Sequence, residues 1–205
     1  MVEQHQSLKE VVSAIVTAYE MDNQKMINQI KKYMKILMMQ VSVQYPEYNI
    51  NSNLIEKIAN STAYFAIGNY TLPKTILYKK GEYTTTEKEI IKNANINGSS
   101  IVKYALTNNS EIDAQYAYEI ARYFNERYEG NGYPEGLSAN SIPLYAQIAS
   151  LAIEYMNLAN TIVPVDYAKI ASLITMESGH KFNPKIVEAF KKVQSEFEAI
   201  TKVGD

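Results

Sequence analysis

The chain of 205 residues contains no cysteine, which leaves it without disulfide bonds and without thiolate metal sites. Histidine and arginine are almost as scarce: His5, His180, Arg122 and Arg127 stand beside eighteen lysines. Bidentate phosphate recognition depends on arginine, so a phosphate-rich ligand would be held mainly by lysine and backbone amides. Together with a formal net charge of −2, this composition predicts no nucleic-acid binding.

Long hydrophobic runs are missing as well. Lysine, glutamine or glutamate interrupts the apolar stretches well short of the roughly 20 residues that a membrane span needs. The first residues, MVEQHQSLKE, have no positively charged start followed by an apolar run, as a secretion signal would have. We therefore expect a cytoplasmic protein with no membrane insertion.

Apolar residues recur at helical spacing along nearly the whole chain, and alternating strand patterns are absent. The clearest stripe is rich in methionine and runs through a helix that Pro46 ends, which predicts a core face or a dimer seam. No period of about 20 to 50 residues repeats. The expected fold class is all-α: a single bundle of about eight helices over residues 1–205.

Some segments interrupt the helical pattern. Pro73 and Gly81 mark residues 69–83 as irregular. Thr84 and Glu87 form a capping box that opens a helix, which is expected to falter over residues 93–98. Ser110 is expected to cap the next helix.

The most informative segment is ERYEGNGYPEGL at residues 126–137, followed in register by IPLYAQI at 142–148. It closely resembles the signature of HD-GYP domains, which are bacterial phosphodiesterases that hydrolyse cyclic di-GMP and related cyclic dinucleotides. The resemblance is clearest over residues 63–199 and implies an HD-domain-like helical bundle. Before about residue 50, only the helical pattern is similar.

The positions that carry metal chemistry in this family hold other residues here. By the resemblance, a His-Asp pair and a nearby lysine are replaced by Phe65, Ala66 and Asn69. A further histidine, a double histidine and a metal-binding aspartate are replaced by Asn93, Phe124, Asn125 and Ile153. A basic loop that lies near the substrate phosphates in the family looks shortened over residues 160–164.

The shortage of ligands can be checked without any alignment. Besides the two histidines, no aspartate lies between Asp22 and Asp113 or between Asp113 and Asp166. Two or three metal ions would each need several imidazole or carboxylate ligands to activate water. We therefore expect no metal or other cofactor and no enzyme. The apolar replacements predict a repacked core, since apolar side chains fill a former polar site without unsatisfied groups.

Three functional hypotheses remain open. The first is a catalytically inactive regulatory module of bacterial cyclic-dinucleotide signalling that binds a signalling protein or a second copy of itself. The second is a sensor that binds cyclic di-GMP without cleaving it. The third is a residual phosphodiesterase or hydrolase that uses Glu126 and Glu129 as acid and base.

The loop and the nearby cations each have a functional and a structural interpretation. The resemblance implies a partner-docking surface in the loop, whereas glycine and proline also serve simply to shape a turn. The residues concerned are Gly130, Gly132, Tyr133, Pro134, Gly136 and Leu137. The cations could contact an anionic ligand or form surface ion pairs. These are Arg122, Arg127, Lys79 and Lys80.

Overall fold

The computed structural model describes residues 2–107 and 112–204. Within these ranges the chain forms ten α-helices and three 3-10 segments, and no strand, which confirms the all-α class. The α-helices are α1 (Val2–Asp22), α2 (Gln24–Gln44), α3 (Ser52–Thr62), α4 (Lys74–Leu77), α5 (Thr85–Leu106), α6 (Ala114–Tyr123), α7 (Leu144–Thr161), α8 (Tyr167–Met176), α9 (Pro184–Lys192) and α10 (Gln194–Gly204). The 3-10 segments are η1 (Pro46–Tyr48), η2 (Ile67–Thr71) and η3 (Ala139–Ser141).

Helix α2 is the central element of the larger core. Its apolar stripe is buried from Ile27 to Val41, and the helix ends directly before Pro46, as the sequence predicts. Helices α3, α7, α9 and α10 pack around it. The stripe of α2, including Met34 and Met38, therefore belongs to the core of the chain rather than to an exposed dimer seam.

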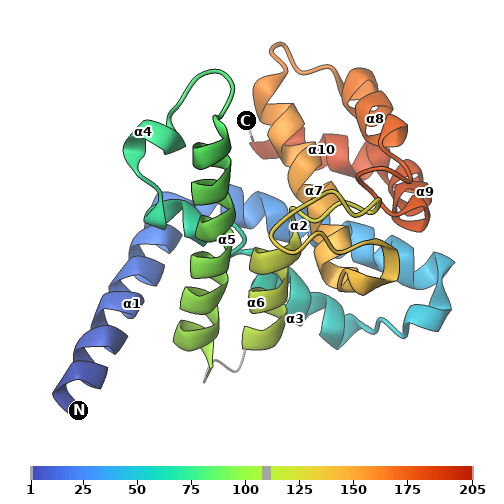
Figure 1. Ribbon diagram of the computed structural model, residues 1–205. Helices are drawn as coiled ribbons and strands as arrows, with labels where there is room; N and C mark the ends of the chain where they lie inside the picture. Colours follow the sequence, from blue (N-terminus) through green and yellow to red (C-terminus); the bar gives the residue numbers. More distant parts are fainter. Residues whose placement is uncertain (1, 108–111, 205) are drawn as a thin grey trace.

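A second, smaller core lies between α1, η2, α5 and α6. Figure 1 shows α1 along the outer side of α5, whereas α8, α9 and α10 gather on the other side of the molecule. Met26 of α2 and Ala66 next to η2 pack against both cores. These two residues join the two halves of the bundle.

Helix α5 is continuous, so the expected weakening over residues 93–98 is wrong. Gly98 is required by a close crossing: a Cβ atom there would lie 2.6 Å from the backbone nitrogen of Gly68. A Cβ on Gly68 would lie 2.3 Å from the carbonyl oxygen of Ala94. The two glycines let η2 pack directly on the backbone of α5, and this gain outweighs the low helix propensity of glycine.

The number of helices also differs from the expected eight, because the segment over residues 69–83 contains the short helix α4 and the C-terminal region divides into α9 and α10. Asp113 caps α6 by accepting bonds from the amides of Gln115 and Tyr116. The expected cap, Ser110, lies outside the described residues. In the part of the chain that the structure describes, no helix combines the length and the apolar character needed to span a bilayer.

Candidate functional site

The seven positions at which the resemblance implies replaced metal or catalytic residues fall into two groups. Phe65 and Phe124 make an edge-to-face contact with ring centroids 5.4 Å apart, and Ile153 belongs to the same core cluster. Phe65 and Ile153 are buried, with exposed fractions of 8% and 3%. An edge-to-face pair of this kind is a favourable apolar contact.

The other four replaced positions do not join this contact. Ala66 is half-buried, while Asn69 and Asn93 are exposed on η2 and α5. Asn125 supports the neighbouring loop, because its carbonyl oxygen accepts a hydrogen bond of 3.2 Å from the amide of Tyr133. The seven positions therefore do not form one cluster of polar side chains.

The metal centre that the resemblance implies would need several imidazole or carboxylate ligands. Among the described residues, no group of three or more His, Cys, Asp or Glu side chains could hold a metal ion. Apolar rings and an isoleucine occupy positions where ligands would be needed. The residues do not fit such a centre, and no hydrolytic step through a bound metal follows from them.

A pocket of about 780 Å³ opens beside two of the replaced positions, Ala66 and Asn69. Its volume lies within the range of about 300 to 1,000 Å³ that is usual for small-molecule sites. The end of α1, the start of α2, η2 and α4 supply its walls. The lining residues are Tyr19, Asp22, Asn23, Met26, Ala66, Asn69, Tyr70, Leu72, Lys74, Leu77 and Tyr78.

Hydrogen bonds hold several polar groups of this pocket in place. The hydroxyl of Tyr70 donates to the Asp22 carboxylate at 2.5 Å, and this bond raises the pKa of Tyr70. The hydroxyl of Tyr19 donates to the carbonyl oxygen of Ala63 at 2.7 Å, while burial raises its pKa. Asn23 donates to the carbonyl oxygen of Tyr19 at 2.8 Å. Both phenols therefore stay protonated at neutral pH, and the Asp22 carboxylate is fixed in direction.

The loop over residues 126–141 is built around a buried carboxylate. Glu126 is 2% exposed, and its two oxygens accept bonds from the amides of Glu135 at 2.8 Å and Leu137 at 3.0 Å. These bonds bring the two arms of the turn together. Glu126 is thus the structural anchor of the loop, and its two oxygens are committed to backbone donors rather than set up for acid–base chemistry.

The glycines and Pro134 shape this loop, which supports their structural interpretation. A Cβ on Gly132 would lie 2.3 Å from the backbone nitrogen of Arg127. Gly130 and Gly136 have φ angles of 91° and 70°, which glycine adopts without strain. Pro134 is buried, whereas Tyr133 and Leu137 are half-buried.

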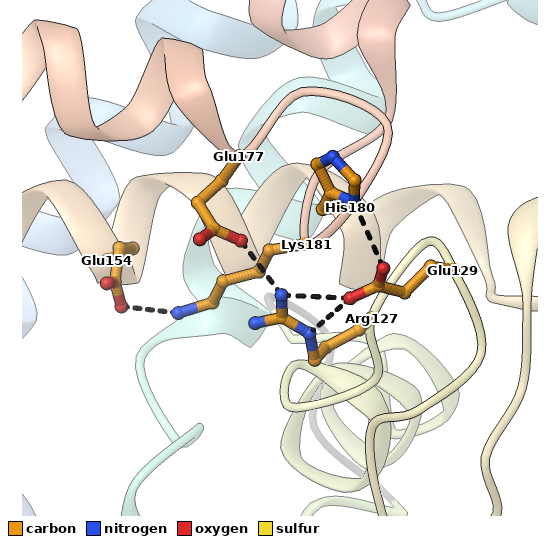
Figure 2. A network of polar contacts seen from close by, with 6 residues as sticks. All are labelled: Arg127, Glu129, Glu154, Glu177, His180 and Lys181. Carbon is orange, nitrogen blue, oxygen red and sulfur yellow. Dashed lines mark hydrogen bonds and ion pairs between the residues drawn. The ribbon is translucent and has the colours of Figure 1, made fainter.

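A network of charged side chains ties the loop to the turn before α9 (Figure 2). Arg127 contacts Glu129 at 3.0 Å and Glu177 at 2.8 Å, and His180 lies 3.1 Å from Glu129. Hydrogen bonds from His180 and then Arg127 lower the pKa of the Glu129 carboxyl. The amide of Glu129 also donates to the carbonyl oxygen of His180 at 2.9 Å.

A second ion pair of the same network, between Lys181 and Glu154 at 2.7 Å, links the turn to α7. The predicted anion-binding cations are also engaged with carboxylates. Arg122 pairs with Glu135, and Lys79 pairs with Glu87, each at 2.5 Å. These contacts favour the ion-pair interpretation for Arg122, Arg127 and Lys79.

Lys80 is exposed next to Lys79. None of the four predicted anion-binding side chains, which include Arg122 and Arg127, lines the large pocket. Residues that sequence reasoning missed are Asp22, Tyr70, Lys74 and Tyr78. No local pattern marks them, because the pocket forms only when α1, η2 and α4 come together.

Comparison with known proteins identifies related chains. The HD domain family matches residues 21–186. A cyclic di-GMP phosphodiesterase of Vibrio cholerae is 29% identical, over 93% of this chain and 40% of its own length. A cyclic di-GMP phosphodiesterase of Thermotoga maritima is 31% identical, over 73% of this chain and 40% of its own length. The chain therefore spans about two fifths of the length of these relatives.

A solved structure has the same fold. It is a cyclic GMP-AMP specific phosphodiesterase of V. cholerae, with a TM-score of 0.59, 16% identity, and coverage of 96% of this chain and 53% of that one. The prediction that the chain is not an enzyme is wrong, because its relatives are named phosphodiesterases and point to an enzyme. That prediction rested on the scarcity of metal ligands in the sequence. The names of the relatives contradict it.

Proposed function

Because this chain belongs to the HD domain family, we propose that it works in bacterial cyclic-dinucleotide signalling and binds a cyclic dinucleotide. The names of the relatives support this ligand class, since they are phosphodiesterases of cyclic di-GMP. Their similarity extends over most of the chain, including the loop at residues 126–137. The match covers 93% of this chain in the V. cholerae relative and 73% in the T. maritima relative.

The observation that carries the proposal is the pocket beside Ala66 and Asn69. It lies where, by the resemblance, Ala66 and Asn69 replace residues of the family's metal and catalytic site, and its volume of about 780 Å³ suits a small molecule. Its walls combine aromatic and aliphatic side chains with fixed polar groups. Aromatic rings suit the flat bases of a cyclic dinucleotide, and the Lys74 ammonium, which lines the same pocket, suits a phosphate.

The test is calorimetric titration of the purified chain with cyclic di-GMP and 3′3′-cGAMP, with the linear dinucleotide as a control. Chromatography of the same mixtures, with and without added manganese or ferrous iron, measures hydrolysis. We expect saturable binding, and a ligand at a hundred times its dissociation constant should stabilise the fold by about 2.7 kcal/mol. The absence of both binding and turnover would refute the proposal.

Loop 126–141 supports a second candidate, a surface that docks a signalling protein or a second copy of the chain. Glu126 and the network of Arg127 hold its backbone in one shape, while Asn131 and Ser138 are exposed. A fixed shape lowers the entropic cost of docking. Light scattering of the wild type and of Asn131→Arg should show whether self-association occurs and depends on this loop.

A further inference from the structure

The large pocket carries two exposed aromatic side chains. Tyr78 is 72% exposed and Tyr70 is 41% exposed, and both line the pocket. Tyr70 is held by its bond to Asp22 and by an edge-to-face contact with Tyr19, with ring centroids 5.7 Å apart. Exposed tyrosine rings around a pocket are suited to stack against flat bases.

The polar groups in this pocket differ in what they can recognise. Asp22 offers a carboxylate, which accepts hydrogen bonds only and has room for about four of them. The hydroxyl of Tyr70 contacts Oδ2, which leaves acceptor capacity for a ligand. The Watson–Crick edge of guanine presents two adjacent donors, N1–H and the N2 amino group. The same edge of adenine presents one amino group beside an acceptor nitrogen, which a carboxylate repels.

A cation lies on the same wall as the exposed ring. Lys74 is the first residue of α4, is exposed, and lines the pocket together with Leu77 and Tyr78. A lysine ammonium binds phosphate as a compact point charge. Carboxylate, aromatic ring and ammonium thus line one pocket, in the combination that a guanine nucleotide needs.

We propose that this pocket binds one guanine base of a cyclic dinucleotide, stacked on Tyr78 and read by the Asp22 carboxylate, with Lys74 contacting the phosphate. The inference rests on the proposed function for the cyclic ligand, and it adds the base and the residues that select it. Because one base is read, 3′3′-cGAMP and cyclic di-GMP both bind, whereas cyclic di-AMP binds more weakly.

The experiment is calorimetric titration of the full chain with cyclic di-GMP, 3′3′-cGAMP, cyclic di-AMP and GMP. We expect Tyr78→Ala to weaken cyclic di-GMP binding by about 10- to 100-fold, through the loss of one stacking contact. Tyr78→Phe keeps the ring and should bind like the wild type. Asp22→Asn should remove the preference for guanine over adenine. Tyr104→Ala, an exposed tyrosine of α5 outside the pocket, is the matched control and should change nothing.

The outcomes separate the two proposals. If cyclic di-GMP binds the wild type, Tyr78→Ala and Asp22→Asn equally well, the guanine pocket is refuted while the proposed function stands. If the cyclic dinucleotides do not bind but GMP binds in a manner that depends on Tyr78, the guanine pocket stands and the cyclic ligand is refuted. If neither GMP nor any cyclic dinucleotide binds and no cyclic dinucleotide is hydrolysed, both are refuted. Circular dichroism of each variant confirms that it is folded.

Discussion

Glu126 is a carboxylate that lies almost completely out of solvent, with both oxygens bonded to backbone amides. Hydrogen bonds to a charged group contribute about 1.5 to 3 kcal/mol each, and an unmatched buried group costs a similar amount. In Glu126→Gln, a side-chain NH2 group replaces one of the two carboxylate oxygens. One of the two backbone amides then faces a donor and loses its hydrogen bond. We expect this variant to lower the free energy of unfolding by about 1.5 to 3 kcal/mol in urea denaturation.

The matched control at the residue scale is Glu135→Gln. Glu135 pairs through its side chain with Arg122 at the surface, and exposed ion pairs contribute about 0 to 1 kcal/mol. Its backbone amide, which donates to Glu126, is unchanged by the substitution. Equal losses for the two variants would show that Glu126 is not the anchor of the loop.

At the scale of elements, the crossing of η2 and α5 depends on two glycines. Gly98→Ala would place a methyl group 2.6 Å from the backbone nitrogen of Gly68, where no flexible side chain can move away. Alanine favours a helix over glycine by about 1 kcal/mol, but overpacking at a close contact costs about 1 to 3 kcal/mol. We expect a lower melting temperature for Gly98→Ala in circular dichroism.

Asn97→Ala tests the same helix without the crossing, because Asn97 is exposed on α5. Alanine has the higher helix propensity, so this variant should match or slightly exceed the wild type in melting temperature. A stabilised Gly98→Ala would mean that η2 and α5 do not meet as closely as described.

At the scale of the whole molecule, an aromatic cluster joins the end of the chain to its first half. Phe197 of α10 is fully buried and stacks on Tyr33 of α2 at 4.7 Å between ring centroids, next to Tyr155 of α7. Ile67 lies fully buried in the smaller core. Since Met26 and Ala66 pack against both cores, we predict that residues 1–205 behave as one domain and unfold together.

Denaturation followed by circular dichroism and by tyrosine fluorescence should therefore give coincident curves. Phe197→Ala should cost about 3 to 5 kcal/mol and Ile67→Ala about 2 to 5 kcal/mol, and each should shift the single transition as a whole. Two separate transitions, with each variant moving only one of them, would show that the cores are independent units.

Features that depend on neighbouring residues could be predicted from the sequence. The helical class, the end of α2 at Pro46 and the capping box at Thr84 all follow from periods and caps that act within a few residues. The resemblance at residues 126–137 correctly indicated the HD domain, since a rigid loop needs particular residues at fixed spacing. The scarcity of histidine and aspartate likewise follows from the sequence, although the prediction of no enzyme drawn from it was wrong.

Features that depend on distant residues were decided only by the tertiary structure. Asp22 and Tyr70 lie 48 positions apart in the chain and meet in the pocket. The continuity of α5 at Gly98 and the burial of Glu126 depend in the same way on which backbone lies opposite. Periodicity shows which face of a helix is buried, but the atoms that meet that face come from other elements, whose placement is set by the packing of the whole chain.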